Sequence, residues 1–314
     1  FAGIDVSTQS LKFTIINLTD RDIVYSDSIN YDKDLPEFQT LNGTTIDPSK
    51  GVSESNPLMW IDALNIVFGR AKRRTNFLPK IRSISVSGQQ HGLVSLAKDG
   101  KLAKPTSKLW NDFSTQSECE LLNIGIGGTD KMIDAIGNSQ KTGYTASKIF
   151  YMFRNEIDYF NATTSFLLVH NYINWYLTGG VKVMEDGDAS GTGLWDPISK
   201  TWSKKLIKFI SEDLFDKLPV VKSSTKSIGK VASDLIVKYG FDPNCTIDAG
   251  SGDNMYGAIG TGNIEPGIVT ISLGTSGTIY TMLDEAFVDP RGEIACFCNS
   301  IGGYMPLICV SNMG

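Results

Sequence analysis

The sequence predicts an α/β protein of two lobes, with mixed β-sheets flanked by helices. The first hundred residues alternate strand-like segments with one amphipathic helix in the order β-β-β-α-β, which is typical of a mixed sheet with helical cover. Residues 115–240 carry mostly helical patterns. After Pro243 a new group of strands and glycine-rich turns begins. We therefore expect a first lobe over residues 1–243 and the start of a second lobe over residues 244–314.

The first lobe is expected to begin with an antiparallel meander. Residues 2–6 form a short apolar segment that ends in a polar turn, residues 11–15 alternate apolar and polar side chains, and residues 22–28 fit a third strand. Residues 32–54 are polar and rich in turn formers, and they predict an inserted loop without a defined place in the fold.

An amphipathic helix should follow this loop. Asn56 is a good N-cap and Pro57 suits the first helical position, and apolar residues then recur at helical spacing up to Phe68. Residues 81–87 and 93–97 predict two further strands.

The later part of the chain predicts fewer strands. One strand-like segment at 166–169 interrupts the helical region, and a helix over 232–239 should end at the glycine that follows it. Residues 245–249 and 268–273 predict strands, with a glycine-rich helix over 254–259 between them.

Composition excludes several classes of function. The chain has 314 residues with 29 basic and 34 acidic side chains, so it lacks the basic surface of a nucleic-acid-binding protein. Its basic run Lys72-Arg73-Arg74 ends a helical pattern, where cations complement the helix dipole. No apolar run has the length of a membrane span, and five cysteines without framework spacing, among them Cys296 and Cys298, indicate free thiols in a reducing compartment. We expect a cytoplasmic protein that binds neither nucleic acid nor membrane, and a homodimer is left open.

Two turns rich in glycine and hydroxyl side chains predict phosphate binding, because backbone N–H groups in such turns form anion-binding concavities. The first, residues 3–10, contains Asp5 inside an apolar strand, where a carboxylate needs a partner or a cation such as Mg²⁺. The second, residues 274–278, lies between two predicted strands and suits the phosphate of a nucleotide. An ordinary hairpin is the alternative interpretation of each.

A third turn, residues 250–254, sets Asp253 near the start of a predicted helix. Asp253 can cap that helix. It can equally be the one carboxylate that phosphoryl transfer needs within reach of the attacking hydroxyl. The spacing alone does not separate these two roles.

Two polar segments suit a polyol ligand. Residues 87–92 combine two adjacent amides with an imidazole in one turn, and residues 110–112 set a tryptophan beside two polar side chains. Each segment is also compatible with a polar surface turn. The chain has neither a G-x-x-x-x-G-K-[ST] loop nor a G-x-G-x-x-G turn after a strand, which disfavours P-loop NTPases, protein kinases and Rossmann dehydrogenases.

In this order, the segments resemble the FGGY family of carbohydrate kinases, and within it the xylulokinase branch. The resemblance runs from the turn at Asp5 to the end of the chain. It implies the two-lobed, actin-like ATPase fold (ribonuclease H-like), ATP and Mg²⁺ as cofactors, and a small ketose as substrate. It also implies that the elements holding adenine lie beyond residue 314, so that the second lobe is incomplete.

The resemblance assigns a role to each matching residue. It implies that Asp253 is the general base and that Asp5 helps to hold the metal. The residues implied to bind the sugar are Gln90, His91, Gly92, Trp110, Asp112, Asp253 and Asn254. The residues implied to bind the nucleotide phosphates are Ser7, Thr8, Gln9, Gly274, Thr275 and Ser276.

The expected activity is the phosphorylation of D-xylulose to D-xylulose 5-phosphate by Mg-ATP. A kinase of another pentulose or small polyol, such as ribulose, is the nearest alternative. An actin- or chaperone-like ATPase without a sugar substrate is a second one, against which the Gln89-Gln90-His91 turn argues. A catalytically inactive sugar-binding relative is the third.

Overall fold

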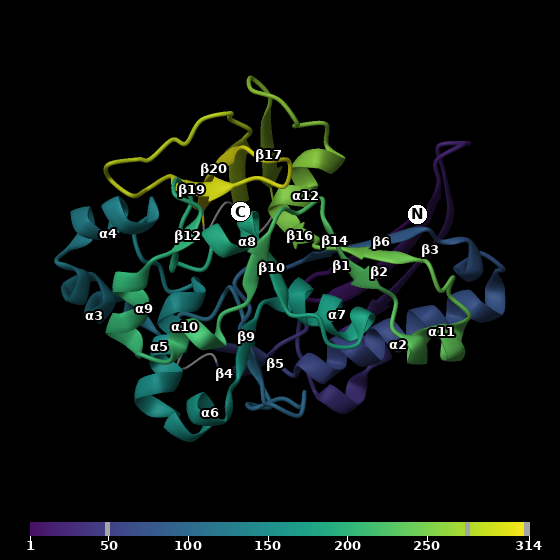
Figure 1. Cartoon of the computed structure of the whole chain (residues 1–314). Coiled ribbons are helices and arrows are strands. Elements are labelled where there is room, and N and C mark those ends of the chain that lie inside the picture. The colour runs from purple at the N-terminus through teal and green to yellow at the C-terminus, as the bar shows by residue number, and fades with distance from the viewer. Residues whose placement is uncertain (48–50, 274–276, 311–314) are drawn as a thin grey trace.

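The computed structural model describes residues 1–47, 51–273 and 277–310 (Figure 1). A mixed sheet of seven strands lies at the centre of the first lobe. Its strands are β1 (Ala2–Val6), β2 (Ser10–Asn17), β3 (Asp22–Asn30), β6 (Ser83–Gly88), β14 (Ser227–Lys230), β15 (Thr246–Asp248) and β16 (Ser251–Gly252). The strand order is β14-β15-β6-β1-β2-β3, with β16 also paired to β6.

The direction of the strands confirms the predicted mixed sheet. β1, β15 and β16 run parallel to β6, while β2 and β3 continue from β1 as an antiparallel meander. The alternation predicted for the second strand is present, because Leu11 and Phe13 are buried while Lys12 between them is exposed. This alternation leaves one apolar face of the meander to be covered.

Helix α2 (Pro57–Arg74) covers that face. The other described helices are α1 (Tyr31–Asp34), α3 (Gln116–Ile126), α4 (Thr129–Ile136), α5 (Thr145–Asn155), α6 (Ile157–Ala162), α7 (Val169–Thr178), α8 (Asp186–Ser190), α9 (Lys204–Ile210), α10 (Leu214–Lys217), α11 (Ser233–Tyr239) and α12 (Asp253–Gly260), with short 3₁₀ turns η1 (Pro36–Phe38) and η2 (Leu78–Lys80). α2 contacts β2 and β3, and α7 contacts β6 and β15 (Figure 1).

The start of α2 follows the predicted signals. The Asn56 side chain accepts a hydrogen bond from the Leu58 N–H at 3.0 Å, and Pro57 takes the first helical position. Phe68 then packs edge-to-face on Phe13 of β2, with ring centroids 5.2 Å apart. This aromatic pair fixes the helix on the apolar face of the meander.

Two short strands confirm predictions from the sequence: β7 (Val94–Leu96) lies in the predicted strand 93–97, and its partner β9 (Ser165–Leu167) overlaps the strand-like segment 166–169. Other short strands have no counterpart in the sequence analysis. They are β4 (Thr45–Asp47) and β5 (Val52–Ser55) with β8 (Ser107–Lys108), β10 (Val183–Glu185) with β13 (Val220–Lys222), and β11 (Trp195–Asp196) with β12 (Thr201–Trp202). The stretch that the sequence did not place therefore contains α1, η1, β4 and β5. The pairing of β5 with β8 attaches this stretch to the first lobe.

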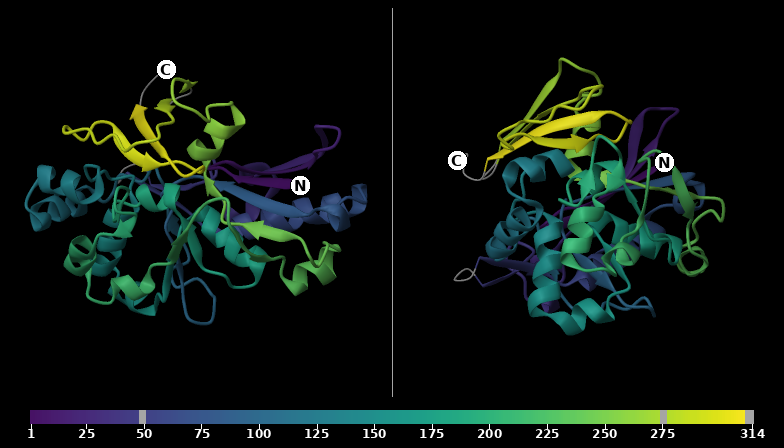
Figure 2. Two further views of the ribbon diagram at one scale, coloured as in Figure 1. Left: turned by 45° about the horizontal axis from the view of Figure 1, so that its top comes forward. Right: turned by 60° about the vertical axis from the view of Figure 1, so that its left-hand side comes forward.

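A second, antiparallel sheet follows α12. Its strands are β17 (Val269–Leu273), β18 (Gly277–Thr281), β19 (Ala295–Cys298) and β20 (Tyr304–Val310), in the order β17-β18-β20-β19. Figure 2 shows this sheet set apart from the large sheet, with α12 leading into it. β15 and β16 lie in the stretch that the sequence assigned to the second lobe, but both strands pair with β6 in the large sheet.

Two expectations from composition can be compared with this fold. Cys296 and Cys298 are buried free thiols, as predicted, whereas the free thiol of Cys309 is exposed. Among the described residues, no helix is both long and apolar enough to cross a bilayer.

Candidate active site

Three neighbouring parallel strands end side by side, and a predicted site segment lies at the end of each. Asp5 on β1 lies opposite Ser87 on β6, and Ser87 lies opposite Ser251 on β16. The turn 88–92 follows β6, and Asp253 follows β16 directly. Ligands of open α/β sheets bind outside the carboxyl ends of the strands, so this register collects the predicted site at one edge of the sheet.

The turn after β1 is connected to both predicted sugar segments. Ser7 Oγ donates to Asp5 Oδ2 at 2.6 Å. Thr8 Oγ1 donates to Gln89 Oε1 at 3.3 Å and accepts from Trp110 Nε1 at 2.9 Å. The indole N–H of Trp110 therefore helps to hold the turn after β1, which the sequence predicted to bind phosphate. Gln9 is exposed.

Asp253 is the first residue of α12 and follows the N-cap Gly252. Its Oδ1 accepts hydrogen bonds from the Asn254 N–H at 2.8 Å and from Asn254 Nδ2 at 3.2 Å. Burial raises the pKa of Asp253 to about 7, and the negative charge of Asp5 adds to the rise. One oxygen thus satisfies an N–H of the first helical turn, and the carboxyl group still titrates where a general base works best. The two roles considered from the sequence are compatible.

Asn254 links three parts of the site. Its Nδ2 donates to Gln90 Oε1 at 3.0 Å, and its Oδ1 accepts from Thr278 Oγ1 at 3.3 Å. Thr278 lies on β18, and Leu273 of β17 pairs with Gly277 of β18, which confirms the predicted hairpin. The phosphate-binding residues predicted at its tip, Gly274, Thr275 and Ser276, lie outside the described residues.

His91 has left-handed backbone geometry, with φ of +66°. Its ring centroid lies 5.0 Å from that of Tyr144 and 6.1 Å from that of Phe297. Burial lowers the pKa of His91 to about 3, and the charge of Lys148 lowers it further, so the imidazole is neutral. Within the described chain, His91 Nδ1 and Gln90 Nε2 are buried polar atoms without a hydrogen-bond partner. Atoms of this kind are what a polyol hydroxyl can satisfy.

The other two predicted sugar residues have packing roles. A Cβ on Gly92 would lie 2.6 Å from Val169 Cγ2, so the glycine lets the turn approach α7 closely. The buried Asp112 carboxylate accepts from the Ser53 N–H at 2.9 Å, Ser114 Oγ at 2.6 Å and Lys108 Nζ at 3.2 Å. Its oxygens are occupied inside the protein, and direct sugar binding by Asp112 stays a prediction.

A buried cluster of titratable side chains beside Asp253 was missed from the sequence. His170 Nδ1 lies 2.7 Å from Asp188 Oδ2, and Glu185 accepts hydrogen bonds from the N–H groups of Gly187 and Asp188. Burial, with the charge of Asp188, raises the pKa of Glu185 to about 8. Possible ligand atoms of His170, Glu185 and Asp188 lie within 4.8 Å of one another. His170 gave no sequence signal because it is a single polar residue in a helix, and the run 185–188 looks like an ordinary polar turn until the fold brings it to His170.

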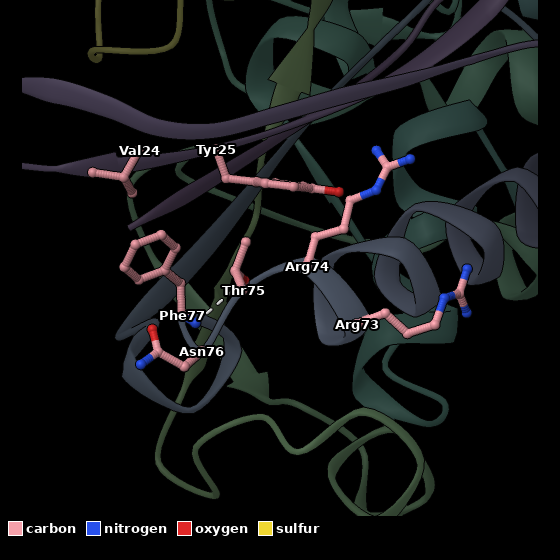
Figure 3. Close-up of a pocket in the computed structure, with 7 residues that line it drawn as sticks. All are labelled: Val24, Tyr25, Arg73, Arg74, Thr75, Asn76 and Phe77. Carbon is pink, nitrogen blue, oxygen red and sulfur yellow. Dashed lines mark hydrogen bonds between the residues drawn. The ribbon is translucent and has the colours of Figure 1, made fainter.

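Figure 3 shows a hollow that is unrelated to these residues. Tyr25 in its wall pairs with Ile15, and Ile15 pairs with Ala2 at the start of β1, so the hollow lies at the opposite end of the sheet from the site. The arginines in it end α2, where the sequence predicted that they complement the helix dipole. Its lining consists of Val24, Tyr25, Arg73, Arg74, Thr75, Asn76 and Phe77.

Comparison with solved structures shows a shared fold. The chain aligns with xylulose kinase from Rhodospirillum rubrum at a TM-score of 0.87 and 22% identity, over 100% of this chain and 61% of that one. It aligns with Plasmodium falciparum glycerol kinase, solved with ADP, at a TM-score of 0.82 and 19% identity, over 99% and 64% of the two chains. The predicted actin-like, mixed α/β fold is thereby confirmed.

Comparison of sequences gives the family. The chain is 36% identical to the xylulose kinase of Haemophilus influenzae over 321 residues, which cover 100% of this chain and 62% of that protein. It is 28% identical to the mouse (Mus musculus) xylulose kinase, over 99% of this chain and 59% of the mouse protein. The chain spans about three fifths of the length of these relatives. Residues 1–260 match the model for the N-terminal domain of the FGGY family of carbohydrate kinases. The chain therefore belongs to the FGGY family of carbohydrate kinases.

Proposed function

We propose that the full-length protein transfers the γ-phosphoryl group of ATP to D-xylulose, with Asp253 as general base. The observation that carries this proposal is the meeting of Asp5, the turn 88–92 and Asp253 at the ends of three adjacent strands. The choice of D-xylulose as substrate rests on relatives that are themselves xylulose kinases.

The electrostatics of Asp253 support its role as base. A pKa of about 7 leaves a large fraction of the carboxylate ionised at neutral pH while keeping it basic enough to take a proton from a hydroxyl. Asn254 holds Oδ1, and within the described residues no side chain or backbone group donates a hydrogen bond to Oδ2. We infer that Oδ2 is the atom that receives the sugar proton.

The nucleotide phosphates would be held between the turn after β1 and the β17–β18 hairpin. Ser7 and Thr8 offer hydroxyl groups at the first of these. Asp5 and Asp253 are two carboxylates near enough that one charge raises the pKa of the other, a donor set that suits a hard divalent cation. When bound at Asp5, Mg²⁺ would offset the negative charge of the phosphates.

The sugar would be recognised at the turn after β6. The neutral His91 imidazole and the Gln90 amide have unpaired polar atoms there, and the rings of Tyr144 and Phe297 surround His91 with apolar surface. A few convergent polar atoms on an apolar wall are typical of sites for small polar ligands. Because these groups suit any short ketose, a kinase of ribulose or another small polyol is the second candidate.

ADP release by the full-length protein, measured across a panel of ketoses and polyols, tests the proposal. We expect the highest kcat/KM with D-xylulose and little ADP release without sugar. A preference for glycerol, or equal ADP release with and without sugar, would contradict it.

A further inference from the structure

Lys148 is a buried lysine that the proposed reaction does not use. It lies in the first half of α5, and its side chain is 1% exposed. Its ammonium donates two hydrogen bonds of 2.8 Å, one to the main-chain oxygen of His91 and one to that of Gly143. Burial lowers the pKa of Lys148 to about 7, although the charge of Asp112 acts in the opposite direction. Burying this group is costly, so a structural or functional gain must offset it.

The two carbonyls belong to the segments that form the wall of the proposed sugar site. His91 has the left-handed backbone conformation, which residues with a Cβ adopt rarely. Gly143 immediately precedes Tyr144, whose ring packs against that of His91. One ammonium group therefore holds both rings through their main chains, and Thr145 Oγ1 adds a weaker hydrogen bond to the same His91 oxygen at 3.4 Å.

We propose that Lys148 is a positioning residue for sugar recognition, which fixes the His91 main chain and the Tyr144 segment against each other. The substrate named in this inference comes from the proposed function. The positioning of the His91 main chain by Lys148 does not depend on that function. Lys148 need not touch the sugar for this role.

Lys217 provides a matched control. Its ammonium also donates to two main-chain oxygens, those of Phe160 at 3.3 Å and Thr163 at 2.7 Å. These acceptors lie at the end of α6, in a part of the fold that contains none of the proposed site residues. A lysine with a purely structural role should resemble Lys217 in every measurement below.

The first test needs no substrate. The sequence in hand contains two histidines, His91 and His170, so in the full-length protein labelled with ring-¹³C histidine the variants His91→Gln and His170→Gln assign the two sets of NMR signals. We expect Lys148→Met to move or broaden the His91 signals and to leave those of His170 in place, while Lys217→Met moves neither. Unchanged His91 signals in a folded Lys148→Met protein would overturn the proposal. Should Lys148→Met fail to fold, Lys148→Gln, which keeps a polar head in the buried space, takes its place with the same expected results.

The second test separates this inference from the proposed function. In the full-length protein we expect Lys148→Met to raise the KM for D-xylulose about 10- to 100-fold, the range for losing charged hydrogen bonds, with the KM for ATP changed less than about twofold. Lys217→Met should leave both constants near those of the parent protein. If the parent protein does not use D-xylulose, the proposed function fails and the NMR result alone decides on Lys148. If it does, and Lys148→Met has a normal KM for the sugar, the inference fails alone.

Discussion

Gln90 and Asn254 share a hydrogen bond of 3.0 Å across 164 residues of sequence. The same Asn254 amide group also lies 3.2 Å from Asp253 Oδ1. The turn proposed to bind the sugar and the proposed base are thus held together by one side chain. This contact joins the turn at Gln90 to the Asp253 carboxylate, and a single substitution can break it.

Replacing Asn254 with alanine removes the donor to Gln90 and the acceptor for Thr278. We expect kcat/KM for the sugar to fall about 10- to 100-fold, because each partner is left without its hydrogen bond. Steady-state kinetics of the full-length variant would measure this. Asn244→Ala is the control, since Asn244 contacts Lys230 on an exposed surface. Equal kinetics of both variants would show that Asn254 does not join the two turns functionally.

Asp253→Asn should remove the base while preserving the shape of the site. We expect turnover to fall about 10²- to 10⁴-fold, the usual contribution of a general base. The affinity for sugar, measured by calorimetry, should stay within about threefold of the parent value, because the Asn254 contacts to neighbouring segments remain. Near-normal turnover in this variant would remove Asp253 from the mechanism.

The same variant should gain thermal stability at high pH. The pKa of Asp253 is about 7 in the folded protein and about 3.9 in an unfolded chain. Between these two values the folded state binds the extra proton, so stability falls as pH rises from about 4 to about 7 and is constant above. The melting temperature of Asp253→Asn should therefore exceed that of the parent protein at pH 8, and the difference should shrink towards pH 4. Melting curves of both proteins, recorded in chelator-containing buffer at pH 4 and pH 8, measure this difference in melting temperature. A difference in melting temperature that does not change with pH would contradict the raised pKa of Asp253.

Gly252 separates two side chains that a methyl group would force apart. A Cβ there would lie 2.7 Å from both Asp188 Oδ1 and Gln90 Cγ. We expect Gly252→Ala to cost about 1–3 kcal/mol of unfolding free energy, as overpacking does, and to lower kcat/KM because Asp253 is the next residue. Gly260→Ala is the control, since Gly260 is the last residue of α12, the helix that Gly252 caps, and a Cβ there would meet no neighbouring group within 4 Å. Denaturant unfolding measures the free energy of unfolding of each variant. Equal values for the two variants would show that the close approach at Gly252 is unimportant.

Local patterns in the sequence were sufficient for the regular elements of the first lobe. Alternating side chains predicted the meander, Asn56 and Pro57 predicted the start of α2, and the glycine after Tyr239 marks the end of α11 with φ of +84°. These features depend on neighbours within a few residues. Local chemistry therefore determines them.

Features that depend on distant partners could not be predicted in this way. β16 contains only Ser251 and Gly252, too few residues for a periodic pattern, and it is a strand because β6 lies beside it. Lys148 stands in a helix as an ordinary polar residue would, and only the fold brings His91 to its ammonium group. The protein partners of Asp112 were likewise not visible in the sequence, because its hydrogen bond to the Ser53 N–H joins residues that are far apart in the chain.

The pairing of β1, β6 and β16 has a consequence for how genes of this kind can change. Asp5, Ser87 and Ser251 stand in one row across three strands, and side chains on a strand alternate between its two faces. Inserting or deleting one codon within β1 would turn Asp5 to the opposite face and would break the row. Substitutions at these positions keep the row intact. The length of these three strands should therefore be tightly constrained, and a deep mutational scan that includes single-codon deletions should show a sharp loss of activity for deletions there.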